Sequence, residues 1–131
     1  GKYIWLKSGA SLVIEHTEAM TVIDVNTGSV LKKKKQEDTL FYQINREAAK
    51  EIARQLRLRN ISGIIMIDFI NMKDTAQKEK LLSLLDSECK KDRVHCNVID
   101  MTALNLVEMT RSKVRKPLHE QIRFCMKNNR S

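Results

Sequence analysis

The chain has 131 residues, of which 42% are hydrophobic and 31% charged, so it fits one folded domain that buries a core without covalent staples. No apolar run approaches the roughly 18 residues that a membrane span needs, and no signal-peptide segment is evident, which predicts no membrane partner. The net charge of +8 favours polyanionic partners, and three cysteines without a CxxC pair favour a reducing, cytoplasmic location.

The first part of the chain is expected to be rich in strands. Residues 3–7 and 11–15 predict two short strands joined by a turn at residues 8–10, and residues 20–26 predict a third. A basic run at residues 32–35 follows in a loop, where it is either a solvated segment or a contact for nucleic acid.

A long helix is expected next, capped by Asp38 or Thr39 and ending near Arg59. One face of it carries an apolar stripe at three- and four-residue spacing, typical of a helix packed on a core. The stripe consists of Phe41, Ile44, Ala48, Ile52 and Leu56.

The remaining elements alternate between strand and helix. Residues 64–70 are nearly all apolar and predict a central strand buried on both faces. A helix over 74–91 follows, and then strands over 94–101 and 104–111. This order predicts an α/β (α+β) fold with a mixed sheet and two main helices, as a sandwich or layered sheet.

Two aspartates interrupt apolar strands and are candidates for chemistry. Asp24 and Asp68 both fall near the carboxyl ends of their strands, and Asn26 shares a face with Asp24. If the strands are neighbours, the three side chains form an oxygen cluster suited to Mg2+. The alternative is that each aspartate pairs with an arginine or caps a loop. No P-loop and no nucleophile motif is present.

Other side chains give weaker signals. The three histidines have no metal-ligand spacing. The aromatic residues are few, and no base-stacking platform is evident among them. They are Tyr3, Trp5, Phe41, Tyr42, Phe69 and Phe124.

Five blocks resemble segments of the ribonuclease E/G family and follow one another in the same order as in that family. They are residues 17–28 (TEAMTVIDVNTG), 45–49 (NREAA), 51–59 (EIARQLRLR), 63–70 (GIIMIDFI) and 107–111 (VEMTR), and the similarity covers residues 2 to about 121. The resemblance implies a DNase I-like catalytic subdomain over residues 1–116. The basic segment 117–131 would then be a tail that begins the family's zinc-link region.

The same resemblance implies roles for particular residues. Asp24 and Asp68 match the family's two magnesium ligands, Asn26 matches the residue that orients the first, and Arg111 matches an arginine at the scissile phosphate. Lys32, Lys33, Lys113 and Arg115 are further expected RNA contacts. The reaction implied is magnesium-assisted hydrolysis of single-stranded RNA that leaves 5′-phosphate ends, with a homo-oligomer expected for the full-length enzyme.

The sequence departs from the family pattern at two places. Asn71 stands where the family has a second acidic residue, and Asn128 stands where the zinc-link has the partner of Cys125, so no zinc site is predicted. The family's other RNA-binding domains are not recognised here. This favours a catalytic domain that has weak or no activity when it is isolated. The alternatives are a non-catalytic RNA-binding or assembly module and, third, a magnesium-dependent phosphatase or DNase.

Overall fold

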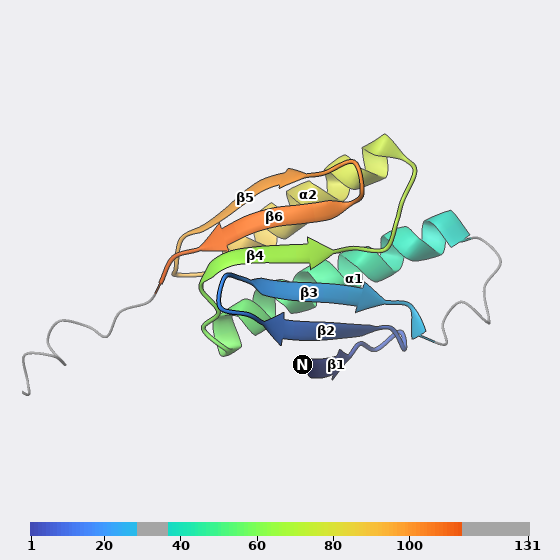
Figure 1. Ribbon diagram of the computed structural model, residues 1–131. Coiled ribbons are helices and arrows are strands. Elements are labelled where there is room, and N and C mark those ends of the chain that lie inside the picture. The colour runs from blue at the N-terminus through green and yellow to red at the C-terminus, as the bar shows by residue number, and fades with distance from the viewer. Residues whose placement is uncertain (29–36, 114–131) are drawn as a thin grey trace, which may run out of the picture.

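The computed structural model describes residues 1–28 and 37–113 as two layers, a six-stranded sheet and two helices (Figure 1). The strands are β1 (Lys2–Trp5), β2 (Ser11–His16), β3 (Thr21–Asn26), β4 (Gly63–Asp68), β5 (Cys96–Met101) and β6 (Leu106–Arg111). The helices are α1 (Glu37–Leu58) and α2 (Thr75–Cys89). The predicted α+β class, with a mixed sheet and two helices, is confirmed.

The sheet has the strand order β1-β2-β3-β4-β6-β5, and it is mixed because one neighbouring pair is parallel. That pair is β3 and β4, while the other four neighbouring pairs are antiparallel. Parallel neighbours need a crossover connection, and α1 lies in the connection from β3 to β4. The crossover brings the carboxyl ends of β3 and β4 to the same edge of the sheet.

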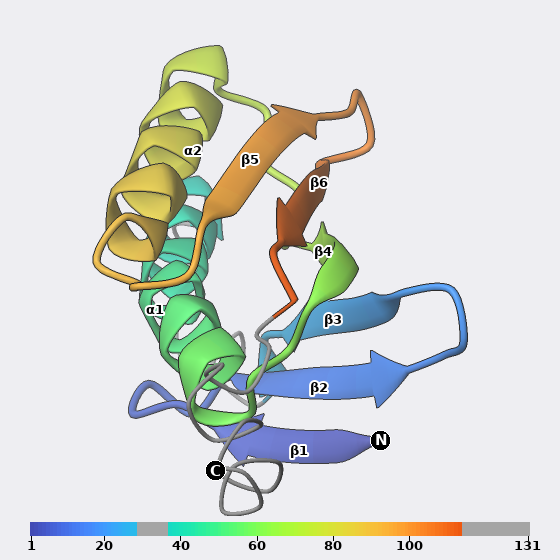
Figure 2. The same ribbon diagram turned by 90° about the vertical axis from the view of Figure 1, so that its left-hand side faces the viewer.

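Both helices cover one face of the sheet and leave the other face open (Figure 2). The helix-side positions of β3 and β4 are buried by strand alternation, and the expected stripe of α1 packs against them. The buried members include Ile23, Val25, Ile65, Ile67, Ile44, Ala48, Ile52 and Leu56. Within the described residues, neither helix is long and apolar enough to cross a membrane.

The structure corrects two details of the expected elements. β4 is central in the sheet but is not buried on both faces, because its open side carries Ile64 at 45% exposure and an exposed Asp68. The prediction failed because Ile64 and Met66 make both faces of this strand apolar, which hides the alternation. α1 begins at Glu37, so Asp38 and Thr39 lie inside the helix and do not precede it as caps.

Candidate active site

Asp24 and Asp68 lie side by side on the open face of the sheet. They are direct partners in the parallel register of β3 and β4, where neighbouring strands are ~4.8 Å apart. Asp24 alternates with the buried Ile23 and Val25, and Asp68 follows the buried Ile67, so both carboxylates point away from the helices. The juxtaposition considered from the sequence is therefore present.

The closeness of the two carboxylates shows in the electrostatics of Asp24. Its pKa is raised, first because the side chain is partly buried, and then by the negative charge of Asp68 and a hydrogen bond to that carboxyl group. The backbone N–H of Val25 acts in the opposite direction. The site thus concentrates negative charge that a cation would relieve. Asp68 is exposed and Asp24 half-buried, so neither is the buried charge that the apolar strands suggested.

Asn26 lies two residues beyond Asp24 on the same face of β3, half-buried. In the described part of the chain, no hydrogen bond joins its amide to the Asp24 carboxylate. Asn26 shares a face with that carboxylate, and its orienting role stays a prediction. The loop beyond it is held close to the β1–β2 turn, because Gly28 has a φ of +60° and a Cβ there would approach the Gly9 carbonyl oxygen to 2.8 Å.

The segment after Asp68 is fixed by a residue that the sequence reasoning did not single out. Asn45 of α1 is fully buried; its amide nitrogen donates to the Ile70 carbonyl over 2.9 Å, and its amide oxygen accepts from the Ile70 N–H over 3.0 Å. These two bonds tie the chain two residues beyond Asp68 to the helix layer. The signal available in the sequence was an asparagine close to the apolar stripe of the helix.

The donor set at this place suits a magnesium ion. Two hard carboxylates meet on an accessible face, and Mg2+ binds through one or two carboxylates together with waters and substrate phosphate. In the described residues, no group of three or more His, Cys, Asp or Glu is arranged to hold a metal. The two residues that could hold such an ion are therefore Asp24 and Asp68.

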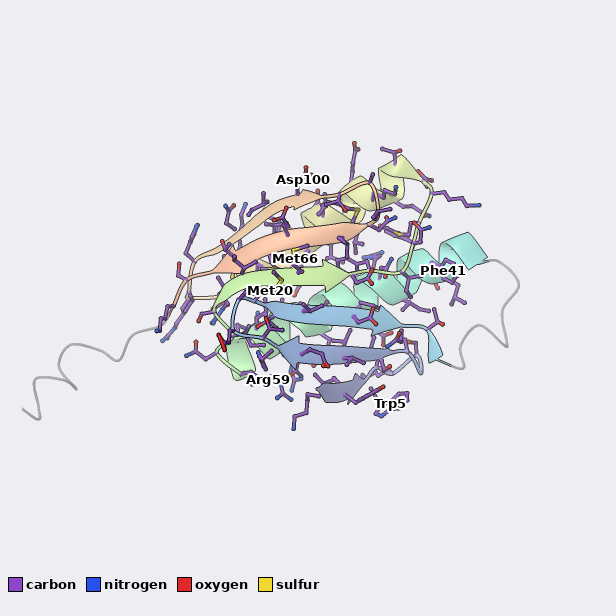
Figure 3. All side chains as sticks on the ribbon, in the orientation of Figure 1. Trp5, Met20, Phe41, Arg59, Met66 and Asp100 are labelled. Atoms are coloured by element: carbon purple, nitrogen blue, oxygen red, sulfur yellow. The ribbon has the colours of Figure 1, made fainter. Side chains whose placement is uncertain are left out.

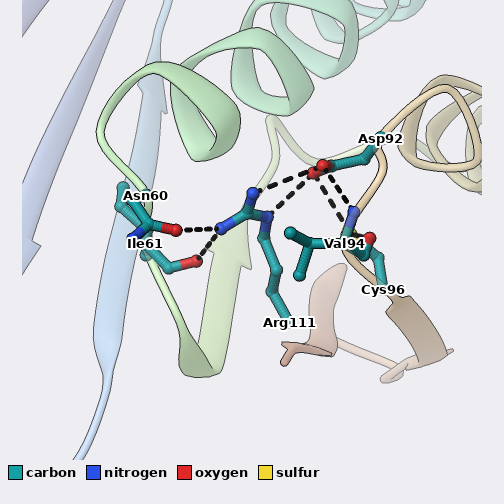
Figure 4. A network of polar contacts seen from close by, with 6 residues as sticks. All are labelled: Asn60, Ile61, Asp92, Val94, Cys96 and Arg111. Atoms are coloured by element: carbon teal, nitrogen blue, oxygen red, sulfur yellow. Dashed lines mark hydrogen bonds and ion pairs between the residues drawn. The ribbon is translucent and has the colours of Figure 1, made fainter. Parts of the chain in front are cut away.

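Arg111 does not join this site. Its guanidinium lies under the sheet on the helix side and is 4% exposed, with Nε 2.8 Å from Asp92 Oδ2 (Figure 4). Nη1 donates to Asn60 Oδ1 over 3.1 Å and to the Ile61 carbonyl over 3.0 Å. Arg111 is opposite Gly63 at the start of β4, ~17 Å along the strand from Asp68. The structure places Arg111 in the framework, so the expected phosphate contact is not carried further.

Of the four expected basic contacts, only Lys113 lies in the described part of the chain, and it is not near the aspartates. Lys113 is exposed and follows β6 beyond Arg111, at the end of the sheet away from Asp68. Lys32, Lys33 and Arg115 lie outside the described residues, as do residues 117–131 of the expected basic tail, so the division at residue 116 stays a prediction.

Asn71, the departure from the family's acidic pattern, has a structural partner. Its side-chain oxygen accepts a hydrogen bond from the amide nitrogen of Asn105, which is buried and has a φ of +65°. The bond ties the segment after β4 to the turn before β6. Asparagine at position 71 thus keeps an acceptor where the family pattern has a carboxylate.

Comparisons with known proteins find relatives over most of the chain. The model of the family described as "Ribonuclease E/G family" matches residues 1–114. Ribonuclease G of Escherichia coli (strain K12) is 48% identical over 113 residues, which are 86% of this chain and 23% of that protein. Ribonuclease G of Haemophilus influenzae is 48% identical over 117 residues, 89% of this chain and 24% of that protein. Ribonuclease E of Nostoc sp. is 42% identical over 115 residues, 88% of this chain and 17% of that protein.

The chain thus spans a quarter or less of the length of these curated relatives. The matched segment contains both aspartates, Asn26 and all eight described elements. The family model matches residues 1–114, which is more than four fifths of the chain. The chain belongs to the ribonuclease E/G family.

Proposed function

We propose that this chain is the magnesium-binding catalytic domain of an endoribonuclease that hydrolyses single-stranded RNA and leaves 5′-phosphate ends. The observation that carries the proposal is the pairing of Asp24 with Asp68 on the open face of the sheet. Membership of a family whose relatives are named Ribonuclease G and Ribonuclease E supports RNA as the substrate.

The chain's own residues would act mainly by holding and orienting. Asp24 and Asp68 would each offer carboxylate oxygens to the ion, and the amide of Asn26 would donate to Asp24 and fix its orientation. A bound magnesium ion supplies activation of water and neutralises charge at the phosphate. The backbone around Asp68 would be held still by the two hydrogen bonds between Asn45 and Ile70, which keeps the carboxylates in register.

The proposal is tested by the single variants Asp24→Asn and Asp68→Asn, each made in the full-length protein that contains this sequence. Each should lower magnesium-dependent cleavage of single-stranded RNA by at least about 100-fold. Removing one anionic ligand weakens the binding of Mg2+, while the exchange of Asp for Asn changes the fold little. The matched control is Asp100→Asn. Asp100 is exposed on the edge strand β5, two strands from Asp68, and should be dispensable.

A second measurement does not depend on activity. Titration of the chain with Mg2+, followed by NMR, should shift amide signals near the ends of β3 and β4, and Asp24→Asn should abolish those shifts. Full cleavage by both Asn variants would overturn the proposal. Salt-sensitive RNA binding without any magnesium response would favour a non-catalytic RNA-binding module, which the net charge of +8 also fits. Assaying DNA beside RNA addresses the phosphatase or DNase alternative.

A further inference from the structure

The open face of the sheet places an aromatic pair in register with the acidic pair. Along one row of direct partners, Tyr3 of β1 is opposite Val13, Val13 opposite Asp24, and Asp24 opposite Asp68. In the next row, Trp5 is opposite Ser11, and Ser11 is opposite Asn26. Tyr3 and Trp5 therefore repeat the two-residue spacing of Asp24 and Asn26, two strands away.

The two aromatic rings are exposed to solvent and are not packed in the core. Tyr3 is 63% exposed and Trp5 is 69% exposed, although large aromatic side chains usually supply much of a core. Their ring centroids are 6.4 Å apart with planes tilted by 32°, so ring surface remains uncovered. Trp5 lies at the β1 edge of the sheet (Figure 3). Between the aromatic and acidic pairs, β2 contributes only Ser11 and Val13, which are buried and half-buried.

The charges beside β1 suit a chain of phosphates. Lys2 and Lys7, which flank the aromatic pair in sequence, are both exposed. A hollow of about 590 Å3 extends from Trp5 towards α1 on the helix side of β1, behind the open face, and its lining holds four basic side chains against three carboxylates. The basic ones are Lys7, Lys50, Arg54 and Arg57. Exposed rings beside cations are the combination by which proteins hold unpaired nucleotides without reading their sequence.

We propose that Tyr3 and Trp5 form a stacking surface for unpaired RNA bases, which seats a nucleotide next to the one whose phosphate lies at Asp24 and Asp68. The spacing suits this, because β1 is two strands, ~9.6 Å, from β3. The identity of the ligand as RNA rests on the proposed function. The surface would bind bases through their flat faces, so it would accept any sequence. It would give this part of the protein a way to bind single strands.

The chain provides its own probe, since Trp5 is its single tryptophan. The 131-residue chain is titrated with a short oligoadenylate in EDTA, while tryptophan fluorescence is followed. Stacking should quench the emission of Trp5, and Trp5→Ala should weaken binding by about tenfold, the loss expected for one base–aromatic stack. Trp5→Phe should restore most of the affinity because it keeps a ring at this position.

Two controls separate stacking from other effects. Leu58→Ala removes an apolar side chain that is 64% exposed at the end of α1, in the helix layer, and should leave binding unchanged. An abasic oligonucleotide of the same length keeps the phosphates and removes the bases. It should bind the wild-type chain at least as weakly as oligoadenylate binds Trp5→Ala, because it can stack on neither ring.

The inference is overturned if oligoadenylate binds without quenching Trp5, or if the abasic and normal oligonucleotides bind equally well. It is also overturned if, in the longer protein, iodide fails to quench Trp5 while Trp5→Ala lowers the melting temperature. That result would identify a contact with another part of the protein. Binding without metal keeps the two proposals apart: an active Asp24→Asn variant refutes the catalytic proposal while the Trp5 effect remains, and the reverse result refutes only the stacking surface.

Discussion

Arg111 shows how one residue can look catalytic in a sequence and be structural in the fold. It closes the VEMTR block that resembles the family, and an arginine near a phosphodiester site has an obvious electrostatic role. In the fold its guanidinium instead joins three distant points, namely Asp92, Asn60 and the Ile61 carbonyl. These partners are 19 to 51 residues away in sequence, so no local pattern could have identified them.

Asp92 is expected to matter for stability because it neutralises this buried arginine. Its side chain is 5% exposed and that of Arg111 is 3% exposed, so Asp92→Ala leaves a buried charge without its counterion. We expect a loss of about 3 kcal/mol in the free energy of unfolding, measured by urea denaturation. The control is Asp86→Ala, which removes the ion pair with Lys90, whose side chains are 41% and 75% exposed, and should cost no more than about 1 kcal/mol. Equal losses in the two variants would contradict the assignment.

The same pair gives a pH dependence with a defined sign. Burial raises the pKa of Asp92, but hydrogen bonds from Arg111 and the Val94 N–H, with the guanidinium charge, hold it below its usual value of 3.8. A carboxyl group with a lowered folded pKa stabilises the protein above its unfolded pKa, and this contribution is lost as the pH falls through the folded value. Wild-type stability should therefore fall below about pH 4 more steeply than that of Asp92→Asn. Parallel curves of unfolding free energy against pH would contradict this.

At the scale of elements, the two-bond clamp between Asn45 and Ile70 connects the helix layer to the end of β4. Asn45→Ala leaves the Ile70 N–H and carbonyl without these partners, which should cost about 2–3 kcal/mol in unfolding free energy. Because Ile70 follows Asp68 by two residues, the variant should also raise the Kd for Mg2+, measured by NMR at a temperature where it stays folded. Gln43→Ala, at an exposed position of α1, is the control. An unchanged Mg2+ affinity would make the clamp purely structural.

The sequence predicted the order and type of all eight described elements, from the apolar stripe of α1, the short apolar run of β4 and the turn residues between the strands. It could not predict that β4 is open on one side, since Ile64, Met66 and the buried Ile65 and Ile67 make both faces apolar. Asp24 and Asp68 are 44 residues apart in the chain, and they become neighbours only through the parallel register of β3 and β4 that the α1 crossover sets. The aromatic pair was missed for a similar reason. Counting aromatic residues conceals that Tyr3 and Trp5 share a face with the aspartates.

The whole molecule combines a net charge of +8 with two adjacent carboxylates at the candidate site. The overall excess of positive charge attracts RNA from a distance. Close to Asp24 and Asp68, however, the carboxylates repel a phosphate. The pKa of Asp24 is raised by burial first and then by the same negative charge of Asp68. A divalent cation would reverse the local sign. Under the proposed function, RNA would therefore be attracted to the chain as a whole, and a phosphate would bind at Asp24 and Asp68 only together with a cation.

This arrangement predicts opposite effects of one variant in two buffers. In EDTA, the double variant Asp24→Asn/Asp68→Asn should bind single-stranded RNA several-fold more tightly than the wild-type chain, because two repulsive charges are gone. With Mg2+ present, the wild-type chain should gain affinity while the variant should not, so the difference shrinks or changes sign. Fluorescence anisotropy at constant ionic strength measures both, with Glu15→Gln/Asp100→Asn, exposed residues of the same sheet, as the charge-matched control. If that control tightened binding equally, the effect would come from net charge alone and not from the position of the aspartate pair.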